Sequence, residues 1–303
     1  MSFTDHERVL APFLKPGTVL HDHDGMPAVP LLNLTPGMYA NAYYFSHPKW
    51  VDVWLRAMHR YPELRERWEA AAGTWDDRIV VDVGCGPGNL FANLGGEPKV
   101  LIGVDIAPYS LKIAEGMGYT PLMADGHDMP LRSGFADLVV MNATVHHMDD
   151  MEQAMRESAR LVGPDGYLII DHDPQKSAWD FRGVGKWLWE LRKPVYRALK
   201  RGGHQAAEDE GKWAHRTELH HRPGDGLTKE MVRDVLDPLE FKIEFYPHNH
   251  HAGAEVLSGA MGEQKKAIRI GQRLSGIRST SEDAALSLLI VARKLGSHTD
   301  PIG

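Results

Sequence analysis

The residues with the clearest chemical potential are five consecutive small residues, Gly84-Cys85-Gly86-Pro87-Gly88, directly after the apolar residues 79–83. Glycine costs conformational entropy in a folded backbone, so three glycines in five positions indicate that something must approach the bare main chain. A helix is expected to begin near Asn89, and free N–H groups at a helix N-terminus bind polar ligand groups. We therefore interpret this segment as a ligand platform between a buried strand and a helix.

The glycine spacing and the preceding charge discriminate between two classes of ligand. Dinucleotide-binding loops carry GxGxxG and hold a pyrophosphate, whereas the spacing here is GxGxG and Asn89 stands where the third glycine would fall. The carboxylate of Asp82, just before the loop, would repel a pyrophosphate and attract a cation. A nicotinamide-dependent oxidoreductase is therefore an alternative against which this loop argues.

Acidic residues also end the next two predicted strands. Asp105 is placed to bind two ribose hydroxyls, and Asp125 and Gly126 offer a carboxylate and a backbone N–H that can read an adenine edge. Because a parallel sheet binds ligands at the carboxyl ends of its strands, we expect these groups to lie together. A nucleoside with a positive charge and an amino-acid tail, such as S-adenosylmethionine, satisfies all of them.

Four stretches together resemble the class I S-adenosylmethionine-dependent methyltransferases. They are VVDVGCGPGNL, LIGVDIAPYSLKIA, MADGHDMPLRSGFADLVVMNATVHHMDD and LVGPDGYLIID, which follow one another in order between residues 79 and 173. The resemblance implies that S-adenosyl-L-methionine is the cofactor and that eleven residues bind it. They are Asp82, Gly84, Cys85, Gly86 and Gly88 at the methionine part, Asp105 at the ribose, Ile106, Asp125 and Gly126 at the adenine, and Asn142 and Ala143 at the sulfonium.

Histidines at two strand ends are the candidates for a general base. His146 and His147 follow the fourth predicted strand, and His172 ends the fifth, which places all three at the ligand-binding edge. A positioned histidine can accept a proton from an alcohol or amine acceptor. Further histidines at 220–221 and 248–251 leave metal binding open as an alternative, but we predict no metal site. Residues 21–24, HDHD, are interpreted as a polar loop.

A regular alternation of strands and helices must position these residues. Strands are predicted at 78–83, 99–105, 121–125, 137–142, 167–171, 241–246 and 286–294. Helices are predicted at 89–94, 108–116, 151–161 and 229–236, and within 48–72, where Pro62 splits the pattern in two. This order predicts an α/β fold, a seven-stranded, mostly parallel, doubly wound sheet whose seventh strand is antiparallel. We divide the chain into a helical cap (1–75), a cofactor-binding core (76–174), a helical insert (175–225) and the remainder of the core (226–297).

The cap and the insert are expected to enclose the methyl acceptor. Aromatic residues near the cap helices could form the pocket walls, and the aromatic insert is interpreted as a lid. The walls would be Tyr39, Tyr43, Tyr44 and Trp50. Helically spaced Lys193, Arg197, Lys200 and Arg201 are either a solvated face or a site for an anionic acceptor.

Composition limits the partners. The 303 residues carry a formal charge of −7 and one cysteine, Cys85, which argues against nucleic-acid or membrane binding and fits the reducing cytoplasm. We therefore predict a cytoplasmic enzyme that methylates a small molecule, with O-, N- and C-methylation all open. RNA or protein as the acceptor, and a non-catalytic nucleoside binder, remain alternatives. The oligomeric state also stays open, with a homodimer as one alternative.

Overall fold

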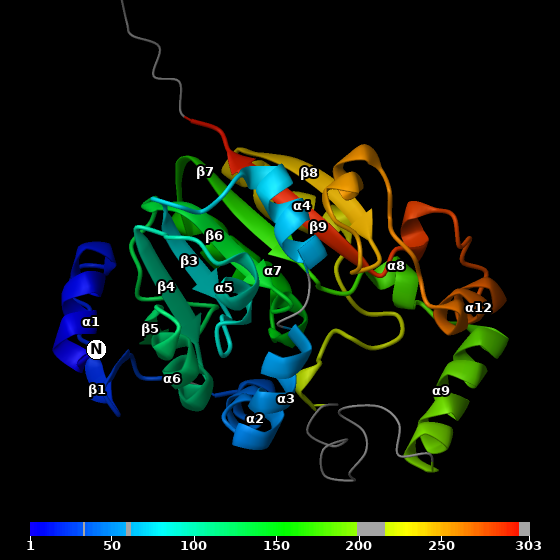
Figure 1. Cartoon of the computed structure of the whole chain (residues 1–303), viewed down its shortest axis with the longest axis horizontal. Helices are drawn as coiled ribbons and strands as arrows, with labels where there is room; N and C mark the ends of the chain where they lie inside the picture. Colours follow the sequence, from blue (N-terminus) through cyan, green and yellow to red (C-terminus); the bar gives the residue numbers. More distant parts are fainter. Residues whose placement is uncertain (33, 59–61, 199–215, 297–303) are drawn as a thin grey trace, which may run out of the picture.

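A computed structural model describes the chain except for residues 33, 59–61, 199–215 and 297–303. Within the described ranges, nine strands form one sheet in the order β1-β2-β5-β4-β3-β6-β7-β9-β8 (Figure 1). The strands are β1 (His21–His23), β2 (Met26–Ala28), β3 (Ile79–Val83), β4 (Val100–Asp105), β5 (Thr120–Met123), β6 (Ala136–Asn142), β7 (Val162–Asp171), β8 (Phe241–His248) and β9 (Ser287–Lys294). The predicted α/β class and its seven strands are confirmed, with two strands added at one edge.

The central strands are parallel and buried on both faces. Strands β5, β4, β3, β6 and β7 pair in parallel, and β9 lies antiparallel between β7 and β8, as predicted for the seventh strand. Val81 and Val83 belong to the hydrophobic core on one face, and Val80 belongs to the core on the other. Continuous apolar strands of this kind are typical of a sheet with helices on both sides.

Most helices begin and end where local sequence signals place them. Their bounds are α1 (Phe3–Leu10), α2 (Pro36–Phe45), α3 (Pro48–Met58), α4 (Pro62–Ala72), α5 (Asn89–Leu94), α6 (Pro108–Gly116), α7 (Met151–Leu161), α8 (Lys176–Trp179), α9 (Gly183–Ala198), α11 (Lys229–Leu236) and α12 (Lys266–Leu274). Thr228 caps α11 by accepting from the Met231 N–H, as its position before the helix predicts. Helices α1 and α2 fall within the predicted helical cap, and α8 and α9 within the predicted helical insert, whereas α12 was not predicted.

The interpretation of residues 21–24 as a loop is wrong. Residues 21–23 form β1, which pairs with β2 through a two-residue turn at Asp24 and Gly25. Both turn residues have positive φ, 51° and 85°, and the Asp22 carboxylate accepts from the Gly25 N–H at 2.6 Å. An Asp-Gly turn of this geometry matches the twist of antiparallel strands and explains the hairpin.

Helices α8 and α9 of the insert lie beside the sheet and build a cluster of their own. Helix α9 packs against α12 at one end of the molecule (Figure 1). The rings of Trp179, Phe181 and Trp189 contact one another, with Phe181 and Trp189 stacked at 4.6 Å. The side chains of Lys193 and Arg197, and all of residues 200–201, lie outside the described part of the chain. Over the described ranges, no helix combines the length and apolar character needed to cross a membrane.

Candidate active site

A cavity of about 1170 Å³, part of it open to solvent, lies at the carboxyl ends of β3, β4, β5 and β6. Ten of the eleven predicted cofactor-binding residues line it, and Gly88 is the exception. They are Asp82, Gly84, Cys85, Gly86, Asp105, Ile106, Asp125, Gly126, Asn142 and Ala143. The sheet order places the ends of β5, β4, β3 and β6 in a row, so the cavity runs along this edge of the sheet.

The three loop glycines are required for different reasons. Gly84 and Gly88 have φ of 69° and 86°, and a Cβ on either would meet a neighbour, Thr144 at 2.2 Å or Met117 at 3.1 Å. Gly86 has φ of 52°, and a Cβ there would meet nothing within 4 Å. The outer glycines therefore permit a tight strand-to-helix turn, whereas Gly86 leaves its main chain open on the cavity.

Two acids beside this loop, the buried Asp82 and the half-buried Asp105, use their oxygens differently. The Asp105 carboxylate accepts from the backbone N–H of Gly86 and of Ala107, both at 2.8 Å. These bonds hold the glycine loop and the turn before α6 against the same carboxylate. Asp82 accepts from the Tyr119 hydroxyl at 2.8 Å, and burial raises the pKa of Asp82 to about 7 against that hydrogen bond. Burial also raises the pKa of Asp105.

The end of β5 presents a carboxylate that stays ionised. Asp125 accepts from the backbone N–H of His127 at 2.9 Å and contacts its Nδ1 at 2.7 Å. Burial opposes ionisation, but these bonds hold the pKa of Asp125 below its usual value and raise that of His127. At Gly126, a Cβ would meet the Met148 side chain at 2.9 Å. His127 was not predicted, although it stands two residues after Asp125, where an aspartate bonds its own chain.

The end of β6 turns sharply into the histidine pair. Ala143 has a φ of 53°, a strained value for a residue with a side chain, of the kind that clusters at functional sites. His146 and His147 follow in a short 3-10 helix, and both line the cavity. Burial lowers the pKa of His146 to about 3 and the pKa of His147 well below its ordinary value. Both imidazoles are therefore neutral at pH 7.

Hydrogen bonds fix how these two rings are held. His146 contacts the buried carboxylate of Asp173 through Nδ1 at 2.7 Å. Nδ1 of His147 lies 2.7 Å from the carbonyl oxygen of Thr217. Because a carbonyl only accepts, Nδ1 of His147 carries the proton and Nε2 carries the lone pair. His147 is thus held in a tautomer that can accept a proton.

The third predicted base is placed differently. His172, at the end of β7, is not among the residues that line the cavity. Its ring contacts Arg67 and Asn142, and burial lowers its pKa to about 3. Cys85 lines the cavity, but burial and the neighbouring acids raise the pKa of its thiol well above the ordinary value, which leaves it an unreactive thiol.

The roof of the cavity comes from the N-terminal helices, on a different face from the one expected. Met38, Asn41 and Phe45 of α2, with Val51 of α3, line it. The predicted wall residues lie elsewhere: Tyr39 and Tyr43 are exposed, and Tyr44 is buried in a stack with Trp50, at 4.5 Å. The Thr35-Pro36 signal could have revealed the start of α2, but not which of its faces lines the cavity, because the helix is apolar on several faces.

One acid from the insert also reaches the cavity. Glu218 lines it, and burial raises the pKa of Glu218 to about 7. The sequence carried no signal for this residue, because its neighbours show no periodicity. The described side chains contain no group of three or more His, Cys, Asp or Glu placed to hold a metal ion.

Comparisons with known proteins agree with this geometry. A family model described as a methyltransferase domain matches residues 81–170. Similar curated proteins include a tRNA (carboxymethyluridine(34)-5-O)-methyltransferase of Arabidopsis thaliana, 33% identical over 96 residues, and a ubiquinone biosynthesis O-methyltransferase of Bordetella avium, 28% identical over 161 residues. The matches cover 30% and 50% of this chain, and 23% and 64% of those proteins, so the chain spans less than two thirds of either relative.

Among solved structures, the plantazolicin methyltransferase BpumL in complex with SAH is similar in fold. Its TM-score is 0.50 at 11% sequence identity, and the match covers 86% of this chain and 95% of that one.

Proposed function

We propose that this chain methylates a small molecule bound beside the cofactor. The premise is that residues 81–170 form a class I S-adenosylmethionine-dependent methyltransferase domain. The observation that carries the proposal is that ten of the proposed cofactor-binding residues and a neutral histidine pair line the same cavity, under a helical roof. The relatives named above act on unlike acceptors by name, so the acceptor class is argued from this cavity alone.

The residues present fit the cofactor at its most demanding points. Gly86 offers bare backbone on the open side of the cavity, and Asp82 is a buried acid whose charge the protein leaves largely unbalanced. The ammonium and sulfonium groups of S-adenosylmethionine supply the missing positive charge. We assign the methionine part to Asp82 and the glycine loop, the ribose to Asp105, and the adenine to Ile106, Asp125 and Gly126. When bound, the cofactor supplies an electrophilic methyl group.

The acceptor is assigned to the side of the cavity beyond β6. His146, His147 and Glu218 lie there with Asn41 and Phe45 of the roof. Among the described residues, no Lys or Arg lines the cavity. We therefore favour a neutral or cationic acceptor over an anionic one. The roof from α2 and α3 encloses this space, which suits a small molecule better than a polymer.

We assign the role of general base to His147. Its tautomer leaves Nε2 as a proton acceptor, and its neutral state at pH 7 follows from its burial. A hydroxyl or amine acceptor loses a proton as the methyl group arrives, and a positioned base contributes about 10²–10⁴-fold to such a step. The remaining acceleration comes from holding acceptor and methyl group in line, to which ordered pairs owe roughly 7–11 kcal/mol.

Cofactor binding is tested by calorimetry with S-adenosylhomocysteine. Asp105→Asn is expected to weaken binding about 10-fold or more, since it removes the charge at the ribose position. Asp165→Asn, at an exposed surface acid, is the matched control and should bind as the unmodified protein does. An unmodified protein that binds a nicotinamide dinucleotide and neither S-adenosylmethionine nor its product would refute the proposal.

Acceptor class is tested with [methyl-³H]S-adenosylmethionine and a panel of small phenols, alcohols and amines, with transfer RNA as the polymer arm. His147→Asn keeps a side-chain N–H near the Nδ1 position, so the bond to the Thr217 carbonyl is retained while Nε2 is lost. Turnover of a hydroxyl or amine acceptor should fall about 10²–10⁴-fold with unchanged S-adenosylhomocysteine affinity. Undiminished turnover would show that the acceptor needs no base, as for an enolate carbon.

A further inference from the structure

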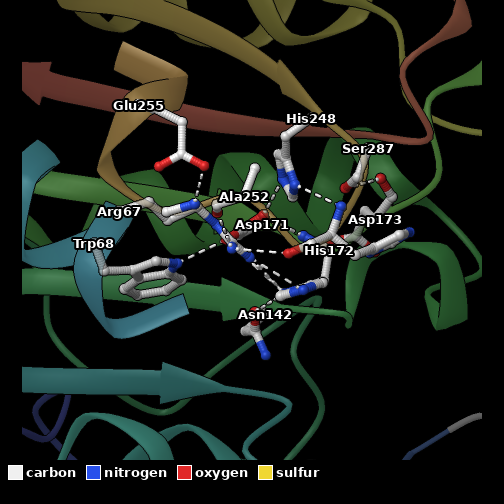
Figure 2. A network of polar contacts seen from close by, with 12 residues as sticks. Arg67, Trp68, Asn142, Asp171, His172, Asp173, His248, Ala252, Glu255 and Ser287 are labelled. Atoms are coloured by element: carbon white, nitrogen blue, oxygen red, sulfur yellow. Dashed lines mark hydrogen bonds and ion pairs between the residues drawn. The ribbon is translucent and has the colours of Figure 1, made fainter. Parts of the chain in front are cut away.

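A buried polar network joins the helical cap to the edge of the cavity (Figure 2). Arg67 of α4 is 0% exposed, and its Nε donates to Asp171 at 2.9 Å. Its Nη1 donates to the carbonyls of His250 and Ala252 at 3.1 and 2.9 Å. The third nitrogen, Nη2, contacts the ring of His172, at 3.1 Å from Nε2 and 3.4 Å from Nδ1. All three guanidinium nitrogens are therefore engaged within the protein.

The oxygens beside Nδ1 determine which nitrogen of His172 carries the proton. Nη2 of Arg67 lies 3.1 Å from Nε2 and 3.4 Å from Nδ1, so it contacts both ring nitrogens and does not distinguish them. Nδ1 lies 3.0 Å from Oδ1 of Asn142 and 3.8 Å from a carboxylate oxygen of Asp171, and because such oxygens only accept, the neutral ring carries its hydrogen on Nδ1. Burial, with Arg67 adding to it, lowers the pKa of His172 to about 3, which agrees with a neutral ring. His172 is thus a donor to Asn142.

This bond sets the direction of the Asn142 amide. Because Oδ1 accepts from His172, the NH₂ end of the amide points away from the network, as Figure 2 shows. Asn142 ends β6 and lines the cavity, and its β7 neighbour in the sheet is Asp171. An amide turned the other way would place its N–H groups against the N–H of His172 and leave an oxygen toward the cavity. The network therefore selects one of two amide orientations.

We propose that His172 is a positioning residue that holds the Asn142 NH₂ group as a hydrogen-bond donor to an oxygen atom of the bound reactants. A donor of this kind has no partner on a sulfonium, so its target is either the carboxylate of the cofactor or an oxygen of the methyl acceptor. The inference rests on the proposed function for its target, whereas the tautomer of His172 stands independently of it.

The first test reads the tautomer directly in the unmodified protein. Long-range ¹H–¹⁵N correlation spectra of protein with labelled histidines distinguish Nδ1–H from Nε2–H rings, and His172→Asn identifies the signal of this residue. We expect a neutral Nδ1–H ring that does not titrate between pH 5 and 8. A ring protonated on Nε2, or one that titrates near its ordinary value, would overturn the inference whether or not the protein methylates anything.

The second test compares two variants that differ in one donor. Asn at position 172 places an amide N–H near the Nδ1 position and tolerates the positive φ of 62° there, whereas Ala supplies no donor. His172→Ala should lower either S-adenosylhomocysteine affinity or kcat/KM for the panel acceptor about 3- to 10-fold, the worth of one hydrogen bond. His172→Asn should recover most of the loss. A loss in affinity assigns the cofactor carboxylate as the target, and a loss confined to kcat/KM assigns the acceptor.

A double-mutant cycle separates positioning from general disruption of the fold. Asn142→Ala removes the amide, so His172→Ala added to it should cause no further loss. Equal losses caused by His172→Ala with and without Asn142 would overturn the positioning role. Equal S-adenosylhomocysteine affinity and equal turnover in the Ala variant and the unmodified protein would do the same.

Discussion

Two carboxylates in the same sheet, Asp82 in β3 and Asp171 at the end of β7, are buried to almost the same extent, at 1% and 0% exposure. Burial opposes ionisation of Asp171, but the guanidinium of Arg67 is the strongest of several partners that hold its pKa well below the ordinary value. Asp82 accepts one hydrogen bond from the Tyr119 hydroxyl, but burial raises the pKa of Asp82 to about 7. The difference teaches that one charge is balanced inside the protein, whereas the other is left to be balanced by a ligand.

The surroundings of each acid explain this division. The carboxylate of Asp171 accepts from Arg67 and from the Trp68 indole, at 2.9 and 2.7 Å. It also contacts His248 at 2.7 Å, away from the cavity. Asp82 lines the cavity, and the charge of another acid, Asp105, raises its pKa further. A buried carboxylate whose oxygens are all occupied by protein donors stabilises the fold. A buried carboxylate at a cavity wall with few such donors is available to bind a ligand.

The largest effect is expected from breaking the buried ion pair of Arg67 and Asp171. Arg67→Met should lower the free energy of unfolding by about 3–5 kcal/mol, because it leaves Asp171 as an uncompensated buried charge. Urea denaturation measures the change. Arg65→Met, on the same helix, is the matched control, since Arg65 pairs with Glu69 on the exposed face and should cost at most about 1 kcal/mol. Similar losses in the two variants would remove the distinction between the charges.

The next largest effect is expected at Asp82, the carboxylate whose charge the protein does not balance. Asp82→Asn removes a charge that the fold does not need, so the free energy of unfolding at pH 7 should stay the same or rise. Affinity for S-adenosylmethionine should fall about 10- to 100-fold, the worth of a charge-assisted hydrogen bond. Calorimetry and urea denaturation measure the two quantities. A variant that loses stability and keeps its affinity would reverse the assignment of Asp82 to ligand binding.

Local signals predicted the elements but not the pairing between distant residues. The predicted bounds of α6 and α7 are confirmed, and Pro108 begins α6 as a first-turn proline does. The hairpin at Asp24 and Gly25 was missed although its turn signal was present. Arg67 and Asp171 are 104 positions apart, and no local pattern connects a helical arginine to one of several strand-end acids.

The candidate site divides along the same line. Residues at the strand ends were predicted because the chain direction and the sheet order bring them to one edge. His172 was predicted as a base from its place at such an edge, but its contacts depend on Arg67 from the cap. The roof residues of α2 were missed because that helix is apolar on several faces, and the choice of face depends on what the helix packs against.

A smaller effect is expected in the number of protons released when the ligand binds, which depends on the charge of Asp82. Below its pKa of about 7 the free carboxyl is largely protonated, and a cationic ligand favours the ionised form. S-Adenosylmethionine binding at pH 6 should therefore release a proton, at most about one, and the release should fade above pH 8. Calorimetry in buffers of different ionisation enthalpy measures it. Glu218 also titrates near pH 7, so Asp82→Asn provides the reference, and release that persists in this variant belongs to another group.

The smallest expected effect comes from removing the hydrogen bond between Tyr119 and Asp82. Tyr119→Phe deletes the hydroxyl that donates to Asp82 and should cost about 1 kcal/mol of unfolding free energy. Because that bond favours the ionised carboxylate, its loss should move the pKa of Asp82 upward and shift the fading of proton release to higher pH. Cofactor affinity at pH 7 should fall slightly, as more of the carboxyl must ionise on binding. An unshifted release profile would mean that the hydroxyl does not control this carboxylate, and that burial and Asp105 alone keep it poised.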